Sequence, residues 1–363
     1  MAMPEVLTKS SILIISVFCL SLYPQSHRKT SVAIQGNQFY INGELTYKGR
    51  FWEDNKIEGL LMNSRMVQGI FDDLNPDTVE NFNYPDTQKW DADRNTNEFV
   101  AAMEDWHRYG LLAFSLNLQG GSPLGYGNKN WINSTFDEKG NLRPAYMKRL
   151  VRILDKADDL GMVVILGYFY FGQDQYLEDE SATLNATDNM THWILKKGYR
   201  NVLIEINNEC NGPYDHDILT PARVHELIQR VKKISQGRLL VTTSYGGGVI
   251  PQENVLRVSD YILIHGNGVH KPSGITEMVR RTKNVKGFAN QPILFNEDDH
   301  FDFDAENYNF KAAIESYASW GYFDYRMNGE KFEDGFQSVP VDWSINSSRK
   351  KAFFKKLKEI TGF

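Results

Sequence analysis

Amphipathic segments and short apolar runs alternate along the chain from Asn97 onward. Apolar residues recur at helical spacing in EFVAAMEDWHRYG (98–110) and AYMKRLVRILDKADDLG (145–161), and both segments end at a glycine. An apolar run of strand length follows each of them, LLAFSLNL and then MVVILGYFYF. The pattern therefore predicts a helix followed by a buried strand, repeated along the chain.

Seven predicted strands each follow a helix, and they begin near residues 111, 163, 202, 239, 261, 292 and 321. The other predicted helices cover residues 187–198, 221–237, 274–285, 305–321 and 347–363. One further strand near Leu60 would give eight strands, which favours an α/β fold of the (β/α)8 TIM barrel type over an open sheet. Nucleotide-binding α/β folds lose support, because the chain has neither GxGxxG after a first strand nor GxxxxGK[ST].

Two shorter features complete the predicted fold. The segment SVAIQGNQFYINGELTYKG (31–49) has turn signals at Gly36-Asn37 and Asn42-Gly43, so we expect a short N-terminal β-hairpin packed on the barrel. Thr220 is the expected N-cap of the helix that has Pro221 at its start. No low-complexity linker interrupts the chain, so residues 31–363 are predicted to form a single domain.

The N-terminus carries an apolar run, SILIISVFCLSLY (11–23), with Lys9 before it and polar residues after it. The run is short for a membrane span and fits the central part of a secretory signal peptide. We therefore predict a signal peptide in residues 1–26. The mature protein is expected to be secreted, periplasmic or extracellular, without a stable membrane span.

Composition and charge limit the partners. The chain has 363 residues, of which 41% are hydrophobic, and a formal net charge of −6. An acidic chain argues against nucleic acid as a partner, because nucleic-acid binding normally needs a basic surface. Its two cysteines, Cys19 and Cys210, are too few for a disulfide scaffold. We expect a monomer.

Polar and aromatic residues end several predicted strands, where barrel enzymes keep their reactive groups. VLIEINNEC carries Glu209, QPILFNE carries Glu297, and DYILIHGN carries His265. Tyr168 and Tyr170 stand near the end of MVVILGYFYF. These side chains are therefore expected around the mouth of the barrel.

Strand alternation places Leu203, Glu205, Asn207 and Glu209 on one face, so Glu205 is expected in the barrel interior below Glu209. A buried carboxylate needs a partner. We interpret Glu205 as structural, with an arginine as one kind of partner.

Two carboxylates facing each other across a barrel mouth suit glycoside hydrolysis. One carboxyl group donates a proton to the leaving oxygen, while the other stays ionised and attacks the anomeric carbon. Asn208, directly before Glu209, is placed to bind the sugar 2-hydroxyl. The predicted partner is a carbohydrate substrate, and this chemistry needs no cofactor.

Around these residues the chain resembles the retaining (β/α)8 glycoside hydrolases of the clan that includes the cellulase-like family 5. IEINNEC is similar to the pattern FEIxNEP that ends their fourth strand, and PILFNE is similar to their seventh strand. His265 matches the end of their sixth strand. The resemblance covers most of the chain from the hairpin onward. It implies that Glu209 is the acid/base and Glu297 the nucleophile.

The chain also departs from that family. Cys210 stands in place of a proline, Asp298-Asp299 in place of an aromatic residue and glycine, and Asn267 where a tyrosine is common. The eighth strand lacks the tryptophan that often lies under the sugar, although Trp320 directly precedes it.

The resemblance further implies an arginine that steadies the nucleophile, and Arg65 is our candidate. Tyr168, Tyr170 and Trp131 are either core residues or platforms for sugar rings, and the long loop GGSPLGYGNKNW (120–131) is a candidate substrate-binding loop. The predicted substrate-binding residues are Asn208, His265, Arg65, Tyr168, Tyr170, Trp131 and Trp320.

The main hypothesis is a retaining glycoside hydrolase that cleaves a poly- or oligosaccharide through a covalent glycosyl-enzyme. Two alternatives stay open. One is a carbohydrate-binding barrel without activity, and the other is a metal-dependent barrel hydrolase that uses Asp298, Asp299 and His300. Shaping of the sugar site and ordinary loop polarity are the other interpretations of these three residues, and no metal ligand is assigned.

Overall fold

The computed structural model describes residues 28–126 and 130–363. The predicted signal peptide, residues 1–26, lies outside the described residues. Within the described part, no helix has both the length and the apolar character needed to cross a membrane.

The described residues form eight parallel strands in one closed ring. Five neighbouring pairs are hydrogen-bonded in the order β10-β9-β8-β7-β6-β13, and β11 pairs with β12. The amide of Asp260 donates to the carbonyl of Val241 between β10 and β11, and a parallel bridge between Leu294 and Ser319 joins β12 to the start of β13. The barrel strands are β6 (Asn63–Arg65), β7 (Ala113–Asn117), β8 (Val163–Tyr170), β9 (Val202–Asn208), β10 (Leu240–Thr242), β11 (Ile262–His265), β12 (Ile293–Glu297) and β13 (Gly321–Tyr322).

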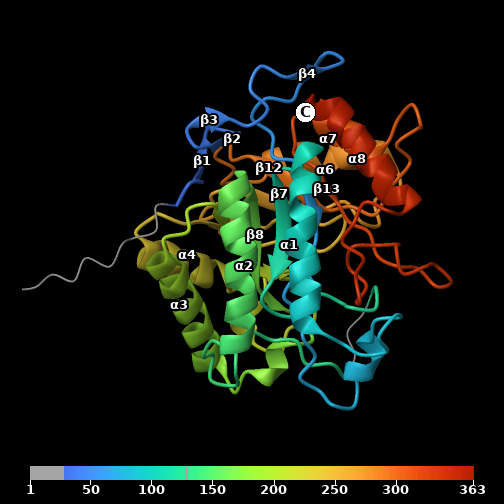
Figure 1. Ribbon diagram of the computed structural model, residues 1–363. Helices are drawn as coiled ribbons and strands as arrows, with labels where there is room; N and C mark the ends of the chain where they lie inside the picture. Colours follow the sequence, from blue (N-terminus) through green and yellow to red (C-terminus); the bar gives the residue numbers. More distant parts are fainter. Residues whose placement is uncertain (1–27, 127–129) are drawn as a thin grey trace, which may run out of the picture.

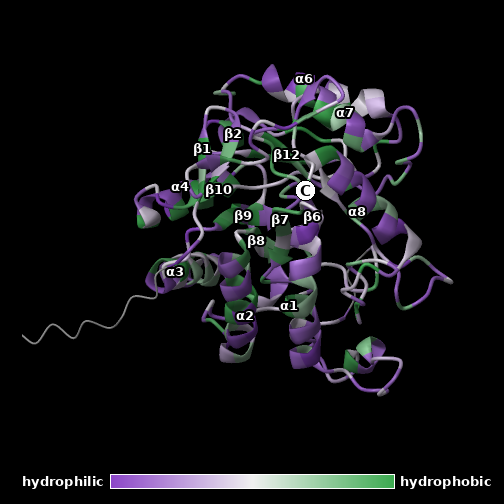
Figure 2. Cartoon of the chain, turned by 45° about the horizontal axis from the view of Figure 1, so that its top comes forward, coloured by the Kyte–Doolittle hydropathy of each residue, from purple (hydrophilic) through white to green (hydrophobic). Residues whose placement is uncertain are grey.

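One α-helix follows each barrel strand in the described residues, so the predicted (β/α)8 barrel is confirmed. In Figure 2 the central strands are largely hydrophobic, and the helices around them turn hydrophilic faces outward. The helices are α1 (Ala92–Arg108), α2 (Pro144–Leu160), α3 (Glu180–Lys197), α4 (Val224–Ser235), α5 (Glu253–Leu256), α6 (Pro272–Lys283), α7 (Asn309–Glu315) and α8 (Ser348–Thr361). Three 3-10 helices lie in the loops, η1 (Val79–Phe82), η2 (Asp174–Tyr176) and η3 (Asp217–Leu219).

Two helix starts differ from the prediction. Helix α3 begins at Glu180, because the side chain of Asp179 accepts a hydrogen bond from the amide of Ala182 and caps the helix there. Helix α4 begins only at Val224, and the Thr220 hydroxyl donates to the Asp217 carbonyl of η3. The prediction that Thr220 caps α4 is therefore wrong.

The N-terminal segment covers the end of the barrel at which the strands begin. Strands β1 (Val32–Gln35) and β2 (Gln38–Ile41) form the predicted hairpin, and β3 (Glu44–Leu45) adds a third strand. The amide of Val32 donates to the carbonyl of Arg200, just before β9, and the Tyr47 hydroxyl donates to the carbonyl of Gly110, just before β7. The opposite end, lower in Figure 1, holds the carboxyl ends of the strands.

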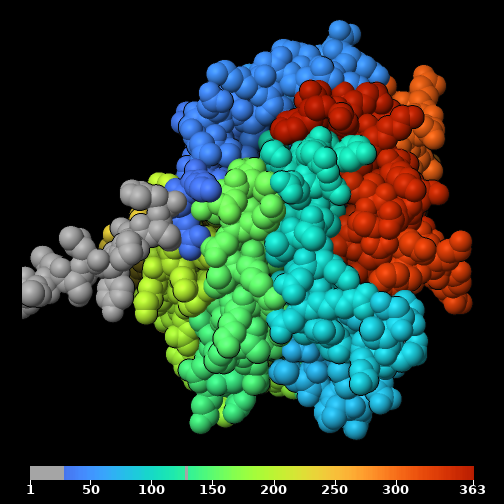
Figure 3. Space-filling model, in the orientation of Figure 1, coloured from blue at the N-terminus to red at the C-terminus, as the bar shows by residue number. Residues whose placement is uncertain are grey.

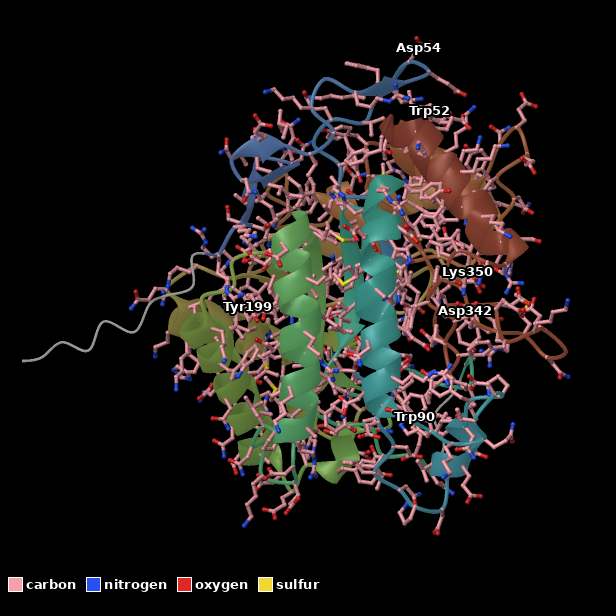
Figure 4. All side chains as sticks on the ribbon, viewed as in Figure 1. Trp52, Asp54, Trp90, Tyr199, Asp342 and Lys350 are labelled. Atoms are coloured by element: carbon pink, nitrogen blue, oxygen red, sulfur yellow. The ribbon has the colours of Figure 1, made fainter. Side chains whose placement is uncertain are left out.

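Helices and a second small hairpin complete the shell. Helices α1 and α2 lie side by side, and α8 lies beyond their upper ends (Figure 3). The hairpin of β4 (Phe51–Trp52) and β5 (Asn55–Lys56) packs against α8, where the Trp52 indole donates to Glu359 (Figure 4). Lys350 of α8 is fully buried and donates to the carbonyl of Asp342, and burial lowers its pKa to about 8.

Candidate active site

The two glutamates predicted at strand ends lie next to each other at the carboxyl end of the barrel. Glu297 is the last residue of β12, and Glu209 directly follows β9. One oxygen of each carboxylate and Nδ1 of His265, at the end of β11, all lie within 4.8 Å of one another. The tertiary structure therefore brings together three residues that are far apart in the sequence.

Glu297 has one ion-pair contact and one hydrogen bond, through different oxygens. Nη1 of Arg65 lies 3.1 Å from Oε2, and the amide nitrogen of Asn267 donates to Oε1 at 3.2 Å. Glu297 is only 4% exposed, and burial raises the pKa of its carboxyl group against the opposing charges of Arg65 and His265. These contacts hold the carboxylate in one orientation.

Glu209 is held differently. Nδ1 of His265 donates to its Oε1 at 2.9 Å and lies 3.4 Å from Oε2 of Glu297. Burial alone would raise the pKa of Glu209, but the hydrogen bond and charge of His265, with the charge of Arg65, outweigh it and hold the pKa below its usual value. The Glu209 side chain is 19% exposed against 6% for Glu297, so it is the more accessible of the two.

His265 links the two carboxylates. Burial by itself would lower its pKa, but the negative charges of Glu297 and Glu209 outweigh burial and raise it. Removal of His265 would raise the pKa of Glu209, because the hydrogen bond and the charge of His265 both lower it.

A His265→Gln variant tests this effect on the pKa of Glu209. If Glu209 is the acid that must be protonated for turnover, the basic limb of the kcat/KM profile is expected to move up by about one pH unit or more. The measurement is the pH dependence of kcat/KM on an aryl glycoside. An unchanged basic limb would contradict the link between His265 and Glu209.

Arg65 lies under the site and is fully buried. Its Nη1 also donates to the amide oxygen of Asn208 at 3.1 Å, and its Nε donates to Gln337 at 2.9 Å. Because Arg65 holds the Asn208 oxygen, the amide nitrogen of Asn208 is the group best placed to donate to a sugar hydroxyl. Arg65 is placed to steady Glu297, as the resemblance implies, rather than to bind substrate directly.

The simple alternation expected along β9 fails at its end. The Asn207 amide donates to the carbonyl of Leu219 and accepts from the hydroxyl of Thr243, whereas Asn208 faces Arg65. The prediction that Asn207 shares a face with Glu209 is therefore wrong. The backbone leaves the regular strand here, since Glu209 has a left-handed φ of 50°.

The predicted aromatic residues divide into two groups. Tyr170 lies near the carboxylates. Burial, with a smaller contribution from their negative charges, raises its pKa, and its hydroxyl lies 2.9 Å from that of Ser122. Tyr168 packs toward α3, with its hydroxyl 3.4 Å from that of Thr191. It lies on the outer face of β8, so its prediction as a sugar-binding residue is wrong.

Trp131 and Trp320 are also core residues rather than sugar platforms. Trp131 is buried edge-on against Phe82. Trp320 stacks on Phe310 of α7 and donates from its indole to Asp298 at 2.9 Å. The prediction that these two tryptophans bind substrate is wrong, because both rings are committed to packing.

An aromatic group not predicted from the sequence lies beside Arg65. The guanidinium carbon of Arg65 lies 5.6 Å from the centre of the Phe323 ring, directly after β13. Tyr126 and Tyr325 pack on Phe323, and Tyr126 is 55% exposed. The position of Phe323 at the end of the eighth strand was the available sequence signal.

Asp298 and its neighbours form a second cluster beside the site. One oxygen of Asp298 accepts from the Trp320 indole and from Asn309, and the other accepts from Nδ1 of His300 at 2.7 Å. The Tyr126 hydroxyl donates to Asp299 at 2.9 Å. These contacts fix the loop after β12, which favours shaping of the site as the interpretation of the cluster.

A glycine-rich loop after β10 touches both sides of the site. The backbone of Gly247 lies close enough to the Glu209 carboxylate to help lower its pKa. A Cβ atom on Gly247 would lie 2.1 Å from the carbonyl oxygen of Asn267, the residue that also binds Glu297. Only a residue without a side chain fits here, because this distance is well inside van der Waals contact.

Gly247→Ala is therefore expected to lower kcat/KM by roughly 10²-fold, the scale reported for a displacement of about 1 Å near reacting groups. Gly246→Ala is the matched control, since its added Cβ would come no closer than 3.4 Å to a neighbour. Kinetics of both variants on one substrate provide the comparison. Equal losses in the two variants would refute the steric explanation.

Comparisons with known proteins support the fold. No protein-family model and no curated protein sequence matches the chain. A family 5 glycoside hydrolase mannosidase from Rhizomucor miehei aligns over 92% of this chain and 98% of its own, with 11% identity and a TM-score of 0.54.

Two bacterial structures are similar to the same extent. A family 5 glycoside hydrolase from Bacteroides vulgatus aligns over 91% of this chain and 70% of its own, with 13% identity and a TM-score of 0.53. A family 2 β-galacturonidase from Eisenbergiella tayi aligns over 90% of this chain and 54% of its own, with 11% identity and a TM-score of 0.51. At these identities the similarity shows a shared barrel fold.

Proposed function

We propose that this protein is a retaining glycoside hydrolase that acts on a poly- or oligosaccharide. The proposal rests on one observation, the pair Glu209 and Glu297, whose carboxylate oxygens lie within 4.8 Å at the carboxyl end of a barrel. The barrel fold shared with glycoside hydrolases of families 5 and 2 supports the same reaction class.

One oxygen of Glu209 lies within 4.8 Å of one oxygen of Glu297, which is compatible with retention. Retaining glycosidases hold their carboxyl groups about 5–5.5 Å apart, whereas inverting enzymes need about 6.5–9.5 Å to admit a water molecule. In the proposed mechanism Glu297 attacks the anomeric carbon and forms a covalent glycosyl-enzyme. Glu209 protonates the leaving oxygen and then removes a proton from the water that hydrolyses the intermediate.

The environments of the two carboxylates support these roles. Glu297 is oriented through both oxygens by Arg65 and Asn267, as a nucleophile requires. Glu209 is the more accessible group, as a residue that meets first the leaving group and then water requires.

The mechanism also requires a proton on the Glu209 carboxyl group when the leaving oxygen departs. In the free protein, burial raises the pKa of the Glu297 carboxyl group, whereas His265 and Arg65 outweigh burial at Glu209 and lower its pKa. The reaction needs the reverse order, so the proposal requires that bound substrate raises the pKa of Glu209 relative to that of Glu297. His265 lies within 3.4 Å of both carboxylates and is placed to pass a proton between them.

Product stereochemistry tests the proposal. The protein is incubated with a panel of plant and algal polysaccharides and aryl glycosides, and the first-formed anomer is identified by NMR. Retention of configuration is expected. Inversion would contradict the mechanism. Binding of a glycan without turnover of any substrate would instead favour the alternative of an inactive carbohydrate-binding barrel.

We also propose that the protein is exported, on the basis of the apolar run at residues 11–23. Export would give a chain that lacks the leader and is found outside the cytoplasm. Mass spectrometry of the protein recovered from the expressing cell and from its medium distinguishes this form from a full-length chain retained inside.

A further inference from the structure

The backbone of Glu209 is in an unfavourable conformation. Its φ of 50° lies in the left-handed region, which residues with a Cβ atom rarely adopt. Such a conformation persists only where surrounding contacts hold it. Since the direction of the Glu209 carboxyl group depends on this backbone, the groups that hold it determine where the proton donor points.

Ser244, the second residue after β10, provides those contacts. Its Oγ accepts a hydrogen bond from the amide of Glu209 at 2.9 Å, and its carbonyl oxygen accepts one from the amide of Cys210, also at 2.9 Å. The second contact gives a reason for Cys210, because proline, which the related motif has at this position, has no N–H group to donate.

The Ser244 hydroxyl is itself oriented from below. Since its oxygen accepts from Glu209, its hydrogen is available to a second partner, and it makes a short hydrogen bond to Oε1 of Glu205. Glu205 and Ser244 are both fully buried. The hydrogen-bond partner of Glu205 is thus a serine hydroxyl and not an arginine. Arg65 acts on Glu205 only through its charge.

We propose that Ser244, oriented by Glu205, is a positioning residue that directs the Glu209 carboxyl group toward the leaving oxygen of the substrate. The inference rests on the proposed function, in which Glu209 is the acid. It gives a role to Glu205, the buried carboxylate in the middle of β9, which touches no reacting atom and acts through Ser244.

Leaving-group dependence tests the inference. Glycosides of weakly acidic phenols need protonation by Glu209, whereas those of strongly acidic phenols leave without it. Ser244→Ala is expected to lower kcat/KM by roughly 10- to 100-fold for the poor leaving groups and by less than about threefold for the good ones, since it misplaces only the acid. A purely structural loss would lower both equally.

Two further variants serve as the negative and the positive control for this experiment. Thr243→Val is the matched control, because it removes a neighbouring buried hydroxyl that binds Asn207 and not Glu209. Its effect should not depend on the leaving group. Glu209→Gln should show the strongest dependence. If the loss of kcat/KM in Glu209→Gln does not depend on the leaving group, the proposed function fails. If the loss in Glu209→Gln depends on the leaving group but the loss in Ser244→Ala, like that in Thr243→Val, does not, only the positioning role of Ser244 is overturned.

Glu205→Gln gives a second route if Ser244→Ala does not fold. Its amide oxygen can still accept from Ser244, so a smaller loss is expected, confined to poor leaving groups. In the double variant with Ser244→Ala, no loss beyond that of Ser244→Ala alone is expected, because both residues act through one chain of contacts. Losses that multiply, or a Glu205→Gln loss that is equal for all leaving groups, would overturn the inference.

Discussion

Replacement of Glu297 by alanine is expected to lower kcat/KM by roughly 10⁵-fold or more, the scale on which loss of a covalent nucleophile acts in other hydrolases. The reason is chemical, since no other carboxylate described at the site is held toward the same point by both Arg65 and Asn267. The measurement is turnover of the best aryl glycoside found by the substrate screen. Labelling of the wild-type protein by a fluorinated glycoside, followed by peptide mass spectrometry, should place the sugar on Glu297.

The controls separate chemistry from folding. Removal of Glu297 leaves the buried Arg65 without its ion-pair partner, which can destabilise a protein by about 3–5 kcal/mol. Glu297→Gln keeps the volume of the side chain, so its thermal unfolding should stay closer to that of the wild type while its activity is lost. Glu315→Ala, an exposed change on α7, should leave kcat/KM unaltered. Substantial activity in a folded Glu297 variant would refute the proposed nucleophile.

Glu209→Gln is expected to lower kcat/KM by about 10²- to 10⁴-fold on substrates with poor leaving groups, the usual contribution of a general acid. Substrates with strongly acidic leaving groups should lose far less at the glycosylation step. Their hydrolysis should then stall at the glycosyl-enzyme, because Glu209 is also the base that activates water.

A burst of released phenol, followed by a slow steady state, is the signal of that stalled intermediate. Added azide, a nucleophile that needs no base, should restore turnover of the activated substrate and yield a glycosyl azide. Glu315→Gln serves as the exposed control. An equal loss on all leaving groups, with no rescue by azide, would mean that Glu209 is not the acid/base.

Much of the site could be predicted from the sequence, because the carboxyl ends of all strands in a (β/α)8 barrel lie at the same end. Once helix and strand patterns indicate eight parallel strands, residues at the strand ends must meet at one mouth. Glu209, Glu297 and His265 were found in this way, although 88 residues separate the two glutamates. Arg65 was also placed correctly beside Glu297, from the resemblance and its position near the first strand.

The contacts that hold Arg65 and Glu209 in place could not be predicted from the sequence in the same way. Gln337, which binds Arg65, lies in a long loop 272 residues away along the chain, and no local pattern marks it. Ser244 stood at a strand end like the glutamates, yet a serine there has many ordinary roles. Trp131, Tyr168 and Trp320 were misassigned because an aromatic ring suits a packed core as well as a sugar face.

The sequence by itself determined the barrel and the chemical character of its mouth, because hydrophobic periodicity sets the order of helices and strands, and closure of parallel strands brings their carboxyl ends together. Only the tertiary structure decided how Glu209 is held. Its left-handed backbone, the turn of Asn207 away from the mouth, and the contacts of Ser244 with Glu205 and Cys210 depend on packing between β9 and β10. Such contacts follow from the three-dimensional meeting of distant side chains, for which a one-dimensional pattern has no signal.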